Sequence, residues 1–252
     1  MLRKVCKNIL LLLLAGSLFL VKNKTAEQET NANNFLYLTD FSNDLTQAIA
    51  SSVIVYATQD GFLDGKTGGG VIWKLDKEMC YIITCAHLFG NMDSPQIYIS
   101  PFLDESSKTK AVLIGRSIDE DIAILYAKTP ESGEKIGEIS DANDIGMPVF
   151  AFGNPGGKGG AVSAGIVSVP NESIGEQIFH RIDCTLLPGN SGGGLFDGQG
   201  QILGIICSKE IGDGSLEGYG FAIPFSVVQT VAISILNNAT AEPHHSTYIN
   251  VN

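Results

Sequence analysis

The sequence predicts an all-β fold made of two packed barrels and closed by a helix near the C-terminus. Short runs of β-branched and aromatic residues recur at regular spacing, and turn-forming residues separate them. No long helical pattern interrupts these runs between residues 52 and 223, which argues against a parallel α/β sheet. About a dozen short strands are too many for one small closed barrel, so we expect two barrels.

The N-terminus has the pattern of a targeting segment. Basic residues precede an apolar run from Ile9 to Val21, which has the length of a signal-peptide core and is short for a membrane span. No clear cleavage site accompanies it, so residues 1–21 are either a signal peptide or an uncleaved signal anchor. We therefore expect an exported protein, periplasmic or secreted, that is held at the membrane only if the segment stays uncleaved. Residues 22–40 are polar and predict a linker.

A single domain is expected over residues 41–237. Residues 42–50 predict a short helix, because a serine start is followed by apolar residues on one side. The expected strands cover residues 52–58, 69–73, 80–84, 96–100, 111–115, 122–127, 148–153, 162–169, 177–183, 194–196, 201–207 and 218–223. The second and third form a hairpin. Pro224 to Asn237 predicts the closing helix, with Pro224 in its first turn, and residues 238–252 predict a polar tail.

Composition excludes several kinds of partner and ligand. The net charge of −11 argues against a nucleic-acid binder, because phosphate backbones are held by an excess of Lys and Arg. Cysteines outside the leader lie in apolar runs, which favours buried thiols, although an exported protein also permits disulfides. They are Cys80, Cys85, Cys184 and Cys207. No pair has zinc-finger spacing, and we expect neither a metal nor another cofactor.

The stretch from Pro188 to Leu195 carries the clearest chemical signal. Ser191 lies between an asparagine and consecutive glycines. Such glycines let the backbone turn tightly and let a substrate carbonyl approach the serine. The N–H groups of Gly189, Asn190 and Ser191 are candidates for binding an oxyanion in front of the hydroxyl. Taken alone, the stretch also fits a glycine-rich surface turn, so the interpretation depends on a base and an acid elsewhere.

Two further residues supply that base and acid. His87 follows the expected strand at residues 80–84, where a base is held on a rigid scaffold. Asp121 directly precedes the strand at residues 122–127, where a carboxylate can orient the histidine and stabilise its protonated form. Each signal is weak alone, since His87 also fits a half-buried structural histidine and Asp121 a solvated acidic turn. We interpret His180, within a strand, as a surface residue.

The order His87, Asp121, Ser191 resembles that of trypsin-like serine peptidases of the HtrA/Deg type. Four ordered segments extend the resemblance over about residues 45–237: the Gly-rich strand Gly68–Ile72, the Gly-Asn-Pro turn Gly153–Pro155, the Gly-Ile-Val-Ser strand Ala164–Ser168 and the Gly-Phe-Ala-Ile-Pro segment Gly218–Pro224. Cys85 departs from the family pattern by replacing the usual asparagine, and Gly194 by replacing the usual proline or alanine. The C-terminal PDZ domain of the family has no counterpart in the sequence.

The resemblance implies a chymotrypsin-like double β-barrel with the active site between the barrels. It implies hydrolysis of peptide bonds in polypeptide substrates, with unfolded or misfolded proteins as the expected class. Ser191 would attack, His87 would act as base and then acid, and Asp121 would orient His87. Some members form trimers through an N-terminal segment, which leaves a homotrimer open for this chain.

Substrate preference is expected to depend on two short segments. By the resemblance, the pocket for the side chain before the cut bond would be lined by Thr185, Leu186, Leu187, Ile206, Cys207 and Ser208. No carboxylate lies at the expected base of the pocket, which favours a small or aliphatic side chain over Lys or Arg. Two alternatives remain: a peptide-binding or chaperone-like module with an inactive oxyanion loop, and an esterase on the same scaffold.

Overall fold

The computed structural model describes residues 45–59, 65–92, 94–131, 133–141, 143–207 and 218–241. The expected leader, linker and most of the polar tail lie outside these ranges, as do Ser208 and the first residues of the expected N-terminal helix. That helix, α2, covers Thr46–Ser51 within the described part. No helix among the described residues combines the length and the apolarity that a membrane span requires.

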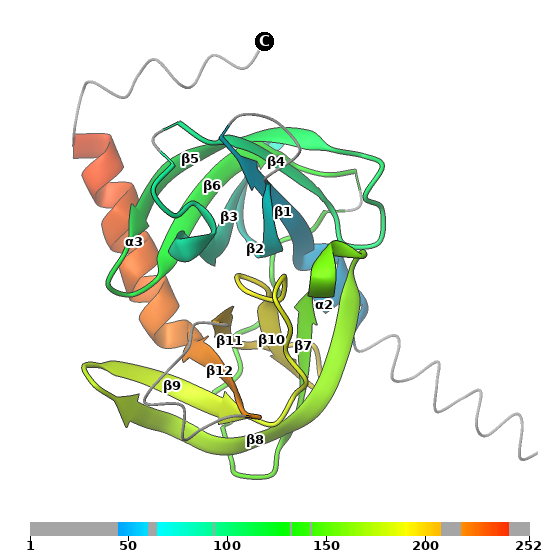
Figure 1. The fold of residues 1–252 in the computed structure, drawn as a ribbon, viewed down its shortest axis with the longest axis vertical. Helices are drawn as coiled ribbons and strands as arrows, with labels where there is room; N and C mark the ends of the chain where they lie inside the picture. Colours follow the sequence, from blue (N-terminus) through cyan, green and yellow to red (C-terminus); the bar gives the residue numbers. More distant parts are fainter. Residues whose placement is uncertain are drawn as a thin grey trace, which may run out of the picture. The chain divides into compact units, whose positions relative to one another are not determined.

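Two closed barrels of six strands each make up the described fold, which confirms the predicted all-β double barrel (Figure 1). The first barrel contains β1 (Ser52–Thr58), β2 (Lys66–Asp76), β3 (Met79–Cys85), β4 (Gln96–Pro101), β5 (Thr109–Ser117) and β6 (Ile122–Lys128). The second contains β7 (Pro148–Gly153), β8 (Ala161–Ile174), β9 (Gln177–Ile182), β10 (Gly194–Asp197), β11 (Ile202–Cys207) and β12 (Gly220–Pro224). All strand pairs within the barrels are antiparallel.

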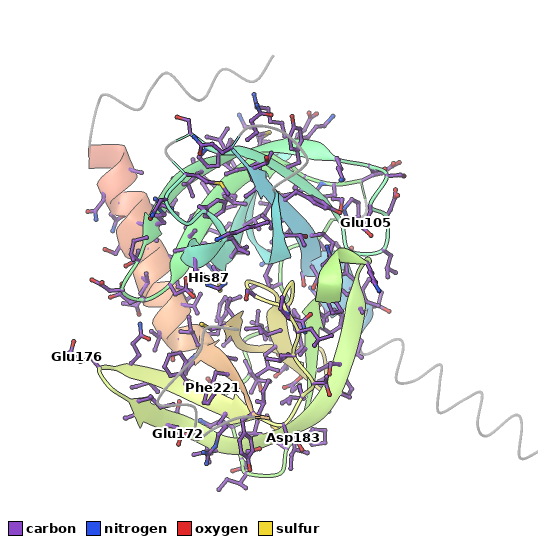
Figure 2. All side chains as sticks on the ribbon, viewed as in Figure 1. His87, Glu105, Glu172, Glu176, Asp183 and Phe221 are labelled. Atoms are coloured by element: carbon purple, nitrogen blue, oxygen red, sulfur yellow. The ribbon has the colours of Figure 1, made fainter. Side chains whose placement is uncertain are left out.

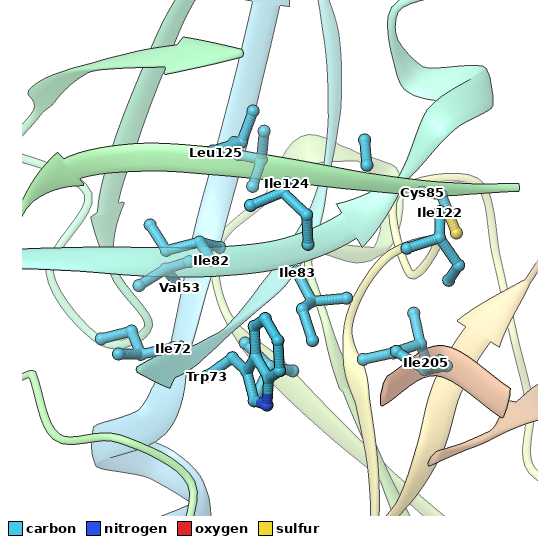
Figure 3. Close-up of a cluster of buried hydrophobic side chains, with 14 of the residues drawn as sticks. Val53, Ile72, Trp73, Ile82, Ile83, Cys85, Ile122, Ile124, Leu125 and Ile205 are labelled. Carbon is cyan, nitrogen blue, oxygen red and sulfur yellow. The ribbon is translucent and has the colours of Figure 1, made fainter. Parts of the chain in front are cut away.

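The largest apolar core fills the first barrel and continues to the second. Strands β1, β2, β3 and β6 contribute branched side chains such as Val53, Ile72, Ile82 and Leu125 to it (Figure 3). Ile205 of β11 belongs to the same buried cluster, so β11 joins the two barrels. Burying one such side chain contributes about 1.5–3 kcal/mol, which makes this shared core a main reason for the two barrels to stay together.

Helix α3 (Phe225–Ala241) begins directly after β12 of the second barrel and packs on β5 and β6 of the first (Figure 1). Val228 and Ala232 on its inner face are fully buried. Pro224 is the last residue of β12 and pairs with Gly204, so it is not the first helical residue that we expected. The helix also continues past Asn237, to Ala241, and Ile235 on its apolar face lies against the first barrel at Gly115, where a Cβ would lie 2.8 Å from Ile235 Cγ2.

His180 lies inside the second barrel, so its interpretation as a surface residue is wrong. Its exposed fraction is 4%, and its strand β9 is an inner strand of the sheet, paired with β8 and with β12. Its Nδ1 accepts a hydrogen bond from the Asn171 N–H at 3.3 Å. Burial lowers the pKa of His180, since the charged imidazolium is poorly solvated there.

Candidate active site

His87 and Asp121 form a close pair at the edge of the first barrel. The distance between His87 Nδ1 and Asp121 Oδ2 is 2.7 Å, and the His87 backbone N–H donates to Asp121 Oδ1 at 2.8 Å. The carboxylate therefore holds both the ring and the main chain of His87. About a third of the His87 side chain stays exposed (35%), which leaves the ring accessible on one side. Figure 2 shows His87 at the level where the two barrels face each other.

The register of β3 and β6 creates this pair. Cys85 and Ile122 face each other across the two strands, so the residues that follow β3 meet the residue that precedes β6. His87 lies in a short 3₁₀ turn, Ala86–Leu88, right after β3. Asp121 adopts a left-handed backbone conformation with φ of 58°, which is uncommon for a residue other than glycine. This turn directs its carboxylate back toward β3, and its carbonyl accepts the Ala86 N–H at 3.2 Å.

The environment of Asp121 keeps its carboxylate ionised. Burial by itself raises the pKa of this group, but hydrogen bonds and charge from His87 together with the Cys207 thiol outweigh burial, so the pKa is lowered below its ordinary value of 3.8. The Cys207 thiol donates to Asp121 Oδ2 at 3.3 Å. A buried anion with three donors can stabilise a positive charge on His87.

Ser191 lies against the first barrel through its backbone. Its carbonyl accepts a hydrogen bond from the Gly69 N–H of β2 at 2.8 Å. A Cβ on Gly192 would lie 2.2 Å from Thr84 Oγ1 and 2.9 Å from Cys85 N, so the chain after Ser191 touches the end of β3 just before His87. The absence of side chains at Gly69 and Gly192 therefore allows the serine loop to approach the strand that carries the histidine.

Two backbone N–H groups near Ser191 are available to bind an anion. Among the described residues, nothing accepts a hydrogen bond from the N–H of Gly189 or of Ser191. The Asn190 N–H donates to the Leu187 carbonyl at 3.0 Å, so we remove it from the expected oxyanion donors. Gly189 has a φ of 105°, a conformation that glycine adopts without strain. The two remaining donors belong to Gly189 and to the serine itself, with Asn190 between them.

No hydrogen bond joins the Ser191 hydroxyl to His87 within the described part of the chain. Such bonds are often long or poorly aligned without substrate and tighten when substrate binds. The Ser191 residue is nearly buried, with an exposed fraction of 4%. The serine therefore lies in a confined setting between the two barrels.

Comparisons with known proteins identify the family of this chain. A family model described as the trypsin-like peptidase domain matches residues 68–205. The chain is 30% identical over 255 residues to a "Serine protease HtrA-like" of Staphylococcus epidermidis, covering 89% of this chain and 42% of that protein. It is 35% identical over 174 residues to a "Probable periplasmic serine endoprotease DegP-like" of Buchnera aphidicola, covering 67% of this chain and 36% of that protein.

The chain belongs to the HtrA-type trypsin-like serine peptidases. It spans less than half the length of these two curated relatives.

Solved structures of HtrA-type peptidases share the fold of this family member. The serine endoprotease of Yersinia pestis has a TM-score of 0.64 at 28% identity, covering 78% of this chain and 66% of that one. The HtrA-type protease AlgW with tripeptide also has a TM-score of 0.64 at 28% identity, covering 79% of this chain and 64% of that one. These likenesses support the chymotrypsin-like double barrel that the sequence motifs of this HtrA-type chain imply.

The expected specificity residues divide into two groups. Thr185, Leu186 and Leu187 lie on the loop before the serine, where Thr185 and Leu187 are exposed and Leu186 is half-buried. Ile206 is fully buried in the core of the second barrel, and its backbone exchanges hydrogen bonds with Gly192 and Gly193. The Cys207 thiol contacts Asp121 instead of a pocket, so the interpretation of Cys207 as a specificity residue needs correction. Successive side chains on a strand point to opposite faces, so Ile206 faces the core of the second barrel while Cys207 faces Asp121.

The four cysteines of the described part are free and buried. A hydrogen bond with Cys207 and burial raise the pKa of Cys85 well above its ordinary value, so this thiol stays protonated. Cys85, His87 and Asp121 each offer one atom able to bind a metal, within 4.8 Å of one another. Two of these side chains, His87 and Asp121, hydrogen-bond each other, and the Cys85 thiol carries a proton.

Sequence reasoning missed two buried residues whose hydrogen bonds lie beside the candidate site. Asn154 is fully buried, yet the sequence presents it only as part of a Gly-Asn-Pro turn. Thr84 donates its hydroxyl to the Gly69 carbonyl at 2.7 Å, next to the contact with Ser191. The sequence places Asn154 in a turn and Thr84 in an expected strand. It does not reveal their hydrogen bonds, because these join positions far apart in the chain. Only the Gly-Asn-Pro motif pointed toward Asn154, and nothing in the sequence singled out Thr84.

Proposed function

We propose that this protein is an exported serine endopeptidase that hydrolyses peptide bonds through an acyl-enzyme. The observation that carries the proposal is the combination of the His87–Asp121 pair with two unoccupied N–H groups beside Ser191. A base fixed by a carboxylate and a preorganised oxyanion site are the two parts that acyl transfer requires. The relationship to HtrA-like serine proteases supports the same activity.

In the proposed reaction, Ser191 Oγ attacks the carbonyl carbon of the substrate while His87 takes the hydroxyl proton. The substrate oxygen becomes an anion and accepts hydrogen bonds from the Gly189 and Ser191 N–H groups. The C–N bond then breaks as His87 protonates the leaving amine, which leaves an ester on Ser191. Water, deprotonated by His87, hydrolyses that ester and restores the serine. Asp121 stabilises the protonated imidazole in each half of the reaction.

The orientation of the loop before Ser191 argues against the peptide-binding alternative with an inactive oxyanion loop. In that alternative a carbonyl oxygen would point into the oxyanion site. The Pro188 carbonyl is instead engaged by the Gly156 N–H at 2.8 Å, which supports a formed site. The substrate class that we propose is unfolded polypeptide, and the export proposal rests on the N-terminal sequence together with the relative named as periplasmic.

Labelling with a fluorophosphonate tests the activity. We expect the purified protein to become covalently labelled and Ser191→Ala to remain unlabelled. Turnover of an unfolded protein such as casein, compared with a matched peptide ester, separates a peptidase from an esterase. A folded protein that binds peptides without labelling would instead establish the binding module. Cell fractionation then locates the protein and tests export.

A further inference from the structure

Asn154 lies at the junction of the two barrels and uses all of its polar groups there. Its exposed fraction is 0%. The side-chain Nδ2 donates to Thr67 Oγ1 at 2.8 Å, and Oδ1 accepts the Gly159 N–H at 2.8 Å. Its main-chain N–H donates to the Gly189 carbonyl at 2.9 Å, and its carbonyl accepts the Gly157 N–H at 3.0 Å. A buried asparagine with this many partners has one defined orientation.

The turn that starts at Asn154 holds the peptide group next to the expected oxyanion site. Two consecutive carbonyls of the serine loop accept hydrogen bonds from it: Pro188 from the Gly156 N–H at 2.8 Å, and Gly189 from the Asn154 N–H at 2.9 Å. No described peptide bond is cis. In a trans peptide the carbonyl and the following N–H point in opposite directions. Because the Pro188 carbonyl points to the turn, the Gly189 N–H points away from it.

The contact between the turn and the serine loop leaves no room for a side chain at residue 189. A Cβ on Gly189 would lie 2.0 Å from the Asn154 carbonyl oxygen, so the two backbones are in direct contact. Gly156 itself has a φ of 67°, and a Cβ there would meet nothing within 4 Å. The close contact is therefore made by the backbone of Asn154.

We propose that Asn154 is a positioning residue that holds the Gly189 N–H in the orientation required to bind the oxyanion. This inference rests on the proposed peptidase function. The side chain of Asn154 ties the turn to Thr67 of β2, and Thr67 Oγ1 in turn contacts the Val55 carbonyl of β1 at 3.2 Å. The same strand, β2, also holds the Ser191 carbonyl through Gly69. The first barrel, which carries His87 and Asp121, thus sets the position of both the serine and its oxyanion donor.

Replacing either partner of the side-chain bond tests the proposal. We expect Asn154→Ala to lower kcat about 10²- to 10³-fold, as for loss of one oxyanion donor, while KM changes less than about threefold. The affinity of a reversible peptide boronate, whose adduct is tetrahedral, should fall in the same ratio as kcat. Thr67→Val should reproduce part of the loss, and Thr67→Ser, which keeps the hydroxyl, should restore it.

Controls separate this inference from the proposed function and from simple unfolding. Gly198→Ala is the matched control, because a Cβ there meets nothing within 4 Å. Each variant is measured at a temperature at which its circular dichroism shows a folded protein. If the unsubstituted protein fails to react with fluorophosphonate, the proposed function fails first. If it reacts, either of two results would disprove the positioning role of Asn154. In the first, Asn154→Ala keeps kcat within about threefold. In the second, Asn154→Ala weakens boronate binding and raises KM by the same factor.

Discussion

The Cys207 thiol donates to Oδ2 of Asp121 at 3.3 Å, the same oxygen that contacts His87 Nδ1 at 2.7 Å. The two residues come from different barrels, since Cys207 ends β11 and Asp121 precedes β6. The carboxylate is therefore supported by the second barrel as well as by His87. Ile206, the residue before Cys207, forms backbone hydrogen bonds with the loop that contains Ser191. One strand thus contacts both the acid and the nucleophile.

The Cys207 contact predicts different results for two substitutions. Cys207→Ala removes a donor to a buried carboxylate, which raises the pKa of Asp121, and we expect kcat/KM to fall about tenfold, or about 1.4 kcal/mol. Cys207→Ser keeps a donor at the same place and should stay within about threefold of the original activity. Steady-state kinetics with a peptide amide measure both. Equal activities of the two variants would show that the thiol does not act as a donor.

Asp121→Asn should leave the fold intact and abolish most of the activity. An amide in place of the carboxylate favours the wrong histidine tautomer and provides no negative charge for the imidazolium, so we expect kcat to fall about 10⁴-fold. Fluorophosphonate labelling should slow to a similar extent. Comparison of thermal unfolding with the original protein checks the fold. A loss below about tenfold would mean that Asp121 does not orient His87.

The contact between Gly69 and the serine loop predicts that alanine substitutions at Gly69 and at Gly198 differ strongly in their effect on stability. A Cβ on Gly69 would lie 2.5 Å from Gly193 Cα and 2.7 Å from Gly193 N, and this backbone cannot move aside without separating the barrels. We expect Gly69→Ala to lower the free energy of unfolding by about 1–3 kcal/mol and to reduce activity with it. Gly198→Ala, made in open space, should change stability by less than about 0.5 kcal/mol. Urea unfolding distinguishes the two outcomes.

Burial of His180 predicts a loss of stability in mild acid. Its pKa in the folded protein lies below the ordinary 6.5, so the unfolded chain binds this proton first as the pH falls. The stability that neutral His180 provides is complete above about pH 6.5 and declines as the pH drops toward the folded-state pKa, by at most about 1.4 kcal/mol per pH unit. His180→Gln, which keeps an acceptor for Asn171, should flatten the decline in urea unfolding between pH 7 and pH 5. Parallel profiles would contradict this.

Much of the barrel architecture was predictable because strand signals are local. Runs such as residues 52–58 and 122–127 consist of residues that suit a pleated, half-buried backbone, and glycine-rich turns separate them. Strand ends were less predictable. β8 continues to Ile174, beyond the expected residue 169, because its pairing with β9 supplies backbone partners that no local pattern reveals.

The histidine, the acid and the serine were recognisable as candidates by their neighbours in sequence, and the family motifs gave their order. By itself the sequence determined the two-barrel architecture and these three candidates, because both depend on residue types at short spacing. Only the tertiary structure decided which groups surround them. It assigned the Asn190 N–H to Leu187, the Cys207 thiol to Asp121 and the Asn154 side chain to Thr67. These bonds join residues on separate strands, and a short hydrogen bond between distant positions exists only after both barrels have closed and packed together.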